Sequence, residues 1–381
     1  MPSTHRRSAA ATAALLTVLA LTATGCQDDP APQAAPPPPS SAPSASAGKG
    51  GIKLPDSLKD LKNWSADDLA NWAKDHGFKP EVLKGYWDQV RMEAAKGVKP
   101  KEANIATAKS PTRSEVQLPP AIAATAEKHP YSPGTAVVGK IFMSVSPTAD
   151  AECSGTVVSD PANPGRSNLV WTAAHCVHEG KDGDWFKKIG FVPSYNRGGA
   201  ASGGKRATVA QLAPYGAWTM DAGYVSPQWV QEGSEKGGPA SQFDFAVFHV
   251  HNEEGGSRSL EETVGGSIPI WFNAPIDTIS AVSAYGYPAE VPFDGRELEH
   301  CDSRVKLTPY VYDPARPPMN AMGCTMTGGS SGGGWFATKP DGKPALVSNT
   351  SVGNDQATFL AGPTLGADAQ KGFEYFSRQK H

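Results

Sequence analysis

From about residue 130 to the end of the sequence, apolar residues come in short runs. Such runs lie at 136–143, 155–158, 243–250 and 345–347, and clusters of glycine, proline, asparagine and aspartate separate them. Short apolar or alternating runs bounded by turn residues are typical of strands in an all-β barrel or sandwich. A β fold of roughly 250 residues commonly forms one unit. We therefore expect residues 130–381 to form a single all-β domain.

Residues 54–97 have helical spacing instead. Ser65 followed by Asp68 is a typical capped helix start, Leu69 and Trp72 then fall on one face, and Gly77 marks the end. A second helix is predicted between a proline at its first turn and the glycine at position 97. Its apolar residues recur every three or four positions. They are Val82, Leu83, Tyr86, Trp87 and Val90.

A hairpin of two such short helices would be only marginally stable by itself. The simplest interpretation of residues 54–97 is a spacer. The alternative is a pro-region or docking element that rests on the β domain. Residues 26–53 are rich in proline, alanine and serine, which predicts an extended tether. Residues 98–129 also have the composition of a linker.

The first 25 residues indicate export. Residues 5–7 are basic, residues 9–23 are apolar and uncharged, and small residues precede Cys26. The apolar run is short for a membrane-spanning helix. The segment resembles a bacterial lipoprotein signal peptide. This resemblance implies cleavage before Cys26, acylation of its thiol, and a mature protein anchored to the outer face of the cell membrane.

The cysteine count agrees with this interpretation. An odd number of cysteines in an exported protein leaves one that cannot pair internally. If Cys26 carries lipid, the remaining four can form two disulfides in an oxidising compartment. These four are Cys153, Cys176, Cys301 and Cys324.

Composition gives no reason to expect a nucleic acid as partner. The formal net charge is −3 and charged residues make up 19% of the sequence. Neither value requires a nucleic acid or an anionic membrane surface as partner. The low charged fraction is also more consistent with turns and short strands than with long helices that carry many ion pairs.

The first candidate for chemistry is His175, in the sequence Thr-Ala-Ala-His-Cys that ends at Cys176. Cys153 begins a Cys-Ser-Gly-Thr sequence upstream. A zinc site would usually bring further ligands in close pairs, and no such pair follows. A disulfide between Cys153 and Cys176 is the simpler interpretation, because it would fasten the loop of His175 to a neighbouring strand. His249 and His251 are interpreted as surface residues.

The second candidate is a turn of glycines and serines, residues 327–334, with Ser330 and Ser331 at its centre. A serine hydroxyl needs a base to become a nucleophile. Backbone N–H groups in a tight glycine turn can face a developing oxyanion. Cys324 and Trp335 flank the turn, which favours a packed loop over a flexible linker.

Together these two motifs resemble the histidine loop and the serine loop of chymotrypsin-like serine proteases. The similarity is greatest to the bacterial branch that includes glutamyl endopeptidases and secreted actinobacterial peptidases, and it covers about the last two-thirds of the chain. It implies two antiparallel six-stranded β-barrels with the active site between them. From their positions and the cysteine count, Cys301 and Cys324 are expected to form the second disulfide, which would close the loop before the nucleophile.

The resemblance assigns roles to named residues. Ser331, which two glycines follow, corresponds to the nucleophile, and His175 to its general base. Asp244, at the start of an apolar run, corresponds to the acid that orients the histidine, with Asp221 as the runner-up. The N–H groups of Gly329 and Ser331 would form the oxyanion hole. The chain order His, Asp, Ser is that of the chymotrypsin branch.

Two departures from the family pattern matter. Ser330 stands where trypsin-like enzymes have an aspartate that takes part in zymogen activation. The pocket for the residue before the scissile bond has no carboxylate at its floor, Thr325 and Met326. Its wall, which includes Ser348 and Asn349, has no histidine. We therefore expect a small or medium uncharged residue at that substrate position.

The sequence as a whole thus predicts a monomeric serine endopeptidase that acts on proteins or peptides and needs no metal or organic cofactor. Two alternatives use the same residues. One is a binding module that has the protease scaffold without catalysis. The other is an esterase with the same triad.

Overall fold

The structure is a computed structural model that describes residues 63–102, 118–279 and 281–381. The signal peptide, Cys26 and the tether at 26–53 lie outside the described residues. So do residues 103–117 of the expected linker at 98–129. Among the residues that are described, no helix is both long and apolar enough to cross a membrane.

The first half of the β domain is a closed antiparallel barrel. Its strands are hydrogen-bonded in the order β5-β4-β7-β8-β9-β6, and pairing of β5 with β6 closes the ring. The bounds are β4 (Val138–Ser146), β5 (Ala149–Val158), β6 (Leu169–Thr172), β7 (Lys187–Pro193), β8 (Trp218–Val225) and β9 (Ala246–Asn252). The expected first barrel of six strands is confirmed.

The second half contains two sheets that enclose a separate core. One has the order β15-β14-β10-β11-β3 and the other β12-β13-β17-β16-β2. Residues from both sheets, including Trp335 of the first and Leu360 of the second, pack in one apolar cluster. The bounds are β3 (Thr125–Ala126), β10 (Val282–Gly286), β11 (Glu299–Ser303), β12 (Thr308–Tyr310), β13 (Met319–Gly323), β14 (Gly334–Thr338), β15 (Pro344–Asn349), β16 (Val352–Gly353) and β17 (Phe359–Pro363). The fold is the expected all-β one.

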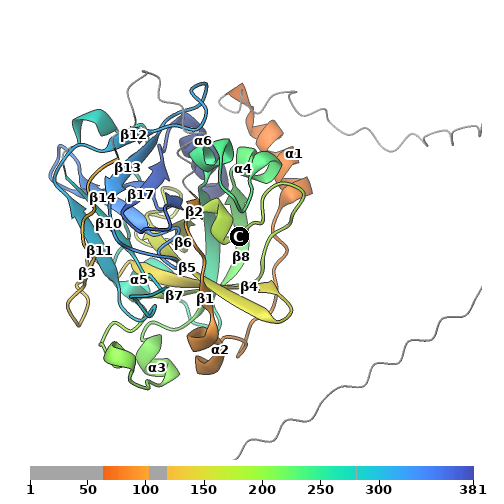
Figure 1. Cartoon of the computed structure of the whole chain (residues 1–381). Coiled ribbons are helices and arrows are strands. Elements are labelled where there is room, and N and C mark those ends of the chain that lie inside the picture. The colour runs from red at the N-terminus through yellow and green to blue at the C-terminus, as the bar shows by residue number, and fades with distance from the viewer. Residues whose placement is uncertain (1–62, 103–117, 280) are drawn as a thin grey trace, which may run out of the picture. The chain divides into compact units, whose positions relative to one another are not determined.

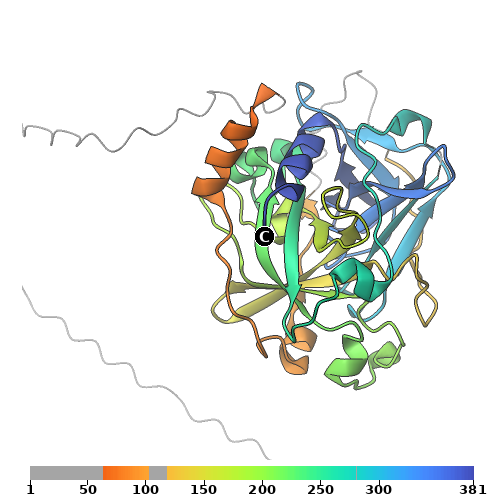
Figure 2. The same cartoon turned by 180° about the vertical axis from the view of Figure 1, so that it is seen from behind.

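Helices are few in the described chain. α1 (Ala66–His76) and α2 (Gln89–Ala94) precede the barrels, and α6 (Ala367–Ser377) follows them. Figures 1 and 2 show α1 beside α6 on the outside of the first barrel. The shorter helices lie in connections between strands, and they are α3 (Val209–Leu212), α4 (Pro227–Glu232) and α5 (Leu260–Val264).

Residues 63–102, which we call the N-terminal arm, pack on the first barrel. Trp64, Trp72 and Trp87 are buried in the same apolar cluster as the barrel strands. The ring of Trp87 lies 5.4 Å from that of Phe142 in β4, and its Nε1 donates to the carbonyl oxygen of Lys188. Residues 138–144 of β4 are therefore buried on both faces, one inside the barrel and one under the arm. The described part of the segment predicted as a spacer, a pro-region or a docking element is thus packed on the first barrel.

The two predicted helices of the arm differ in outcome. α1 begins as expected, because the Ser65 side chain accepts from the Asp68 backbone and Asp68 reaches back to Ser65. The second helix was predicted too long, since only α2 is helical. Gly85 has a positive φ of 73°, which ends helical continuity. Leu83 is buried while Val82 is exposed, so the apolar residues do not form one helical face.

Two further strands come from the arm. β1 (Lys96–Gly97) pairs with β5 of the first barrel, and β2 (Lys101–Glu102) pairs with β16 of the second half. In Figure 1 this orange-brown stretch runs between the yellow-green first half and the blue second half. Residues 98–102, expected to be linker, therefore lie between the two halves.

Candidate active site

His175 is held by the end of one strand and by a disulfide. β6 ends at Thr172, and Ala174–Cys176 form a short 3-10 turn. Cys176 is bonded to Cys153 of β5, so the turn is fastened to the barrel wall. Because both sulfurs belong to the disulfide, neither is a thiolate that could bind a metal. The second expected disulfide, Cys301–Cys324, is also present.

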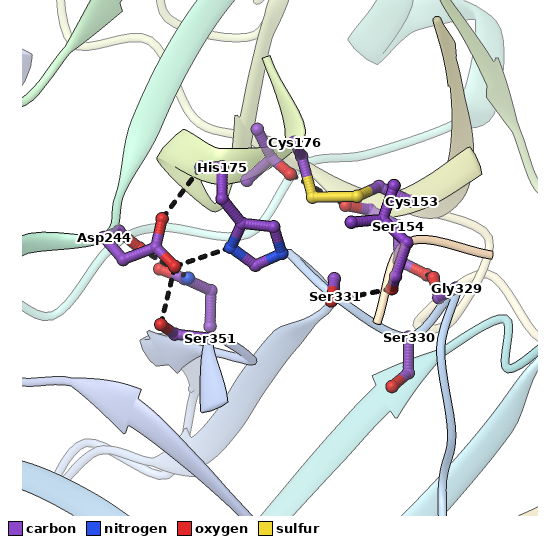
Figure 3. The surroundings of a disulfide bond; sticks show 12 residues. Cys153, Ser154, His175, Cys176, Asp244, Gly329, Ser330, Ser331 and Ser351 are labelled. Atoms are coloured by element: carbon purple, nitrogen blue, oxygen red, sulfur yellow. Dashed lines mark hydrogen bonds and ion pairs between the residues drawn. A yellow bond between two sulfur atoms is a disulfide. The ribbon is translucent and has the colours of Figure 1, made fainter. Parts of the chain in front are cut away.

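Asp244 lies between a 3-10 turn, Pro239–Phe243, and strand β9. Its carboxylate is fully buried and accepts three hydrogen bonds. Oδ1 accepts from the backbone N of His175 at 2.9 Å. Oδ2 accepts from His175 Nδ1 at 2.6 Å and from Ser351 Oγ at 2.6 Å. Figure 3 shows these contacts, with Ser331 on the far side of the imidazole.

Ser351 also contacts the Asp244 carboxylate, and the sequence did not reveal it. It lies in the short connection between β15 and β16, and it is fully buried. No motif marks it, because its partner Asp244 is 107 positions away.

The surroundings set the protonation states of this pair. Burial lowers the pKa of His175, because a protonated ring would be a buried charge, and the attraction of Asp244 offsets only part of this effect. Burial alone would raise the pKa of Asp244. The interaction with His175 and the hydrogen bond from Ser351 outweigh burial and hold that pKa below its usual range. Near neutral pH, Asp244 is therefore ionised and His175 neutral, with its proton on Nδ1 and a free lone pair on Nε2.

Asp221, the runner-up, has different partners. It lies in β8, where its carboxylate is hydrogen-bonded to His249 Nδ1 at 2.7 Å and to His251 Nδ1 at 3.1 Å. Both histidines belong to the neighbouring strand β9. Of the two candidate acids, the structure places Asp244 beside His175 and Asp221 beside His249 and His251.

The turn that carries Ser331 requires glycine at two positions. Gly329 and Gly332 have positive φ angles of 96° and 79°. A Cβ on Gly329 would lie 2.5 Å from the Tyr287 carbonyl oxygen, and one on Gly332 would lie 2.0 Å from Thr172 Oγ1. Close packing against both halves of the domain therefore fixes the shape of the turn.

Ser154 fastens the same turn to the first barrel. Its backbone N donates to the Ser331 carbonyl oxygen at 2.7 Å, and its Oγ donates to the Gly329 carbonyl oxygen at 2.9 Å. Ser154 belongs to the Cys-Ser-Gly-Thr motif, which by itself does not indicate this role. Ser330, also buried, donates its hydroxyl to the Thr327 carbonyl oxygen at 2.7 Å.

A peptide carbonyl of the arm occupies the space above this turn. The oxygen of Val98 accepts from the backbone N of Gly329 at 2.9 Å and from Ser331 Oγ at 3.1 Å. The Nε2 atom of His175 has no hydrogen-bond partner. The Ser331 hydroxyl thus donates to Val98 and not to the imidazole.

A cavity of about 680 Å³ is lined on one side by residues 96–101 of the arm and also by His175. Met326, one of the expected pocket residues, lines it, as do Gly353, Asn354 and Phe359. The other three expected pocket residues are not among its lining residues. The Oγ1 of Thr325 accepts from the Ala124 backbone, Ser348 Oγ donates to the Pro363 carbonyl oxygen, and Asn349 bridges Trp171 and the Asp244 carbonyl oxygen.

The fold and this arrangement define a class, the proteases built from two β-barrels with a histidine, an acid and a serine between them. No family model matches the chain. The chain resembles the solved structure of the thermostable serine protease AL20 from an extremophilic microorganism, with 30% identity and a TM-score of 0.52. The match covers 65% of this chain and 100% of that one. The chain therefore belongs to the chymotrypsin-like serine proteases.

Two further comparisons agree on the family. The solved structure of the protease Anisep from Arthrobacter nicotinovorans is 27% identical, with a TM-score of 0.51 over 67% of this chain and 100% of that one. A mouse protein named inactive serine protease 35 is 29% identical over 30% of this chain. That match spans only 37% of the length of the mouse protein.

Proposed function

We propose that the protein is a serine endopeptidase that hydrolyses peptide bonds through an acyl-enzyme. Ser331 is the nucleophile, His175 the general base, and Asp244 the group that orients and stabilises the imidazole. The backbone N–H groups of Gly329 and Ser331 hold the oxyanion.

One observation carries this proposal. A peptide carbonyl, that of Val98, accepts a hydrogen bond from Gly329 N beside the Ser331 hydroxyl. The site therefore accommodates a peptide group where the reaction requires one. The neutral His175, which donates from Nδ1 to Asp244, has its Nε2 lone pair available for the Ser331 proton.

The steps follow from these positions. Ser331 Oγ gives its proton to His175 Nε2 and attacks the substrate carbonyl carbon, and the resulting imidazolium is stabilised by Asp244. His175 then protonates the leaving amine, the peptide bond breaks, and the acyl group stays on Ser331. A water molecule, deprotonated by the same imidazole, releases the acid product and restores the serine.

Labelling by a fluorophosphonate tests the nucleophile. We expect covalent labelling of the protein and its loss in Ser331→Ala, with Ser330→Ala as the matched neighbouring control that keeps the label. The Val98 carbonyl oxygen accepts from the Ser331 hydroxyl and could slow the reaction. The labelling is therefore followed over hours, and it is repeated in the Gly97→Leu variant described below, in which the segment around Val98 should be displaced. Absence of label under both conditions would indicate a non-catalytic binding module.

Turnover of matched peptide and ester substrates distinguishes an endopeptidase from an esterase. Both activities require the same three side chains, so Ser331→Ala abolishes either one. We expect peptide hydrolysis, with a small or medium uncharged residue before the scissile bond. A cleavage profile dominated by arginine, lysine or glutamate at that position would contradict the proposed preference.

We further propose that the mature chain begins at Cys26 and is held at the outer face of the membrane by acyl chains. The small residues before Cys26 after an apolar run support this proposal. Cys26→Ala should release the protein to the medium or leave the signal peptide uncleaved. A fully processed Cys26→Ala protein that stays with the membrane would contradict it.

A further inference from the structure

Residues 96–102, which we call the strap, connect the first barrel to the second half of the domain. β1 of the strap pairs with β5, and the Val98 backbone N donates to the Glu152 carbonyl oxygen at 2.8 Å. β2 pairs with β16, and the Lys101 backbone N donates to the Ser351 carbonyl oxygen at 2.7 Å. The strap is therefore held by main-chain hydrogen bonds on both sides of the cavity.

The middle of the strap lies on the catalytic groups. Its Val98 carbonyl oxygen takes the hydrogen bond of Gly329 N, which the reaction needs for the oxyanion. It also accepts the only hydroxyl hydrogen of Ser331. Because a serine has one O–H to donate, Ser331 cannot at the same time donate to His175 Nε2, which has no partner. The strap thus occupies the substrate position and removes the contact that would activate the nucleophile.

The fit beside Val98 is close. An added Cβ on Gly97 would lie 2.6 Å from the carbonyl carbon and oxygen of Gly328 and 2.8 Å from the backbone N of Gly329. These are main-chain atoms of the turn that carries Ser331, so they cannot move aside as a flexible side chain could. Glycine at position 97 is what allows the strap to lie against this turn.

Lys101 of the strap also brings a charged group close to the catalytic pair. Lys101 is buried, and the carboxylates of Asp244 and Glu235 partly offset the effect of burial, which lowers its pKa. The Lys101 charge in turn lowers the pKa of His175 and so disfavours the imidazolium that catalysis requires. Lys99 Nζ lies 3.9 Å from Glu290 Oε2, and the Lys99 side chain is exposed while that of Glu290 is partly exposed.

The rest of the arm keeps the strap close to its site. Arg91 of α2 is paired with Asp150 of β5 at 2.9 Å, directly before the strap begins. Trp87 is buried against β4. A segment tethered in this way meets its binding site at a high effective concentration, so modest contacts suffice to keep it bound.

On the basis of the proposed hydrolytic function, we infer that residues 96–102 are an autoinhibitory strap. It occupies the oxyanion site and the nucleophile of its own chain, and the protein becomes active when this segment leaves the cleft. The occupant is this chain itself, so latency requires no separate inhibitor.

Gly97→Leu tests the strap without changing a catalytic residue. The leucine side chain cannot fit against Gly328 and Gly329, so the strap should leave the cleft. Fluorophosphonate labelling and peptide hydrolysis should then rise about tenfold or more, as expected when less than a tenth of the wild-type protein is open. Gly198→Leu is the matched control, because Gly198 is exposed and an added Cβ there meets no atom within 4 Å. This control should behave like wild type.

Amide hydrogen exchange supplies a readout that does not depend on activity. In wild type the amides of Val98 and Lys101 should be protected, and in Gly97→Leu their protection should fall while that of β4 stays unchanged. Lys101→Glu is a second variant, since it places a carboxylate near Asp244 and should displace the strap from its other end. It is used if Gly97→Leu does not fold.

The outcomes separate the two proposals. One outcome is that hydrogen exchange shows the strap to have left the cleft in Gly97→Leu while this variant and wild type have equal activity. That result overturns the inhibitory role of the strap, and the hydrolytic function stands. Cleavage of the wild-type chain after Val98, seen by mass as a new N-terminus at Lys99, would show that the strap is a substrate and overturn its inhibitory role. If neither protein reacts although the strap has left, the hydrolytic function fails, and inhibition fails with it.

Discussion

The substitution Asp244→Asn should remove most of the catalytic activity, and the hydrogen bonds of the carboxylate explain why. Its two oxygens accept from three donors, which are the His175 backbone N, His175 Nδ1 and Ser351 Oγ. A carboxylate accepts at every position, whereas an asparagine has one acceptor oxygen and one NH₂ group. The NH₂ group must therefore face at least one of these donors.

The two orientations of the amide differ in cost. With NH₂ in place of Oδ1 it faces the His175 backbone N–H, which cannot become an acceptor, and a buried unpaired donor costs about 1–3 kcal/mol. With NH₂ in place of Oδ2, both partners can adapt. The Ser351 hydroxyl can rotate to accept, and the imidazole can move its proton from Nδ1 to Nε2. The second orientation is favoured, and the protonated Nε2 can no longer accept the Ser331 proton.

The expected loss in turnover is about four orders of magnitude, the effect of this exchange in another serine protease. It corresponds to about 5 kcal/mol of activation free energy. Asp221→Asn is the matched control, because Asp221 also accepts from histidine side chains, but from His249 and His251. It should change turnover by no more than a few-fold.

The assay is kcat and KM with a peptide substrate, measured in wild type or, where the strap blocks it, in the Gly97→Leu background. The imidazole tautomer of His175 is read from its ¹⁵N chemical shifts at neutral pH. We expect the proton on Nδ1 with Asp244 and on Nε2 with asparagine. If Asp221→Asn abolished activity and Asp244→Asn did not, the assignment of the catalytic acid would be wrong.

Two further predictions concern stability. Both disulfides close segments with a sequence separation of 23, so replacing either pair by serine should lower the free energy of unfolding by about 3 kcal/mol in a denaturant titration. Only loss of Cys153–Cys176 should also impair turnover, because the Cys301–Cys324 pair does not hold the turn of His175; equal losses of turnover would contradict this. Burial and two nearby carboxylates raise the pKa of Glu299 from 4.5 to about 7. The folded state is therefore progressively disfavoured as pH rises from about 4.5 to about 7, and the full loss is present above that pH. Glu299→Gln should raise stability at pH 8 by up to about 3 kcal/mol, with no gain at pH 4; a gain that is the same at both pH values would refute the stated cause.

The parts of the site that the sequence predicted are those with local signals. The turn of His175 is marked by the cysteine beside it, and the turn of Ser331 by glycines that the backbone geometry requires. The helix cap at Ser65 involves residues three positions apart, so it too can be recognised locally. Spacing within a few residues carries this information.

The parts that were missed depend on contacts between distant segments. The predicted second helix failed because burial of Leu83 and Trp87 against the barrel outweighs their helical spacing. Residues 98–102 of the strap were predicted to be linker, and residues 96 and 97 were placed at the end of the helical region. The strap is held by main-chain hydrogen bonds to Glu152 and Ser351, and no side-chain pattern indicates such bonds. Asn349, which was expected on the pocket wall, accepts a hydrogen bond from the buried indole of Trp171, a partner 178 positions away that local sequence does not indicate.

Ser330 is consistent with inhibition by a segment that occupies the active site. An aspartate here would link activation to a new N-terminal charge, as in trypsin-like enzymes. Ser330 is buried and satisfies its hydroxyl within its own turn, at Thr327. With the arm still in place, Gly329 N already donates to a peptide carbonyl, so this donor of the proposed oxyanion site is in position without a further activation step. For the proposed endopeptidase, occupation of the site by the strap is therefore a sufficient means of inhibition. Departure of residues 96–102 should therefore suffice for activity, with no new ion pair at the Ser331 turn.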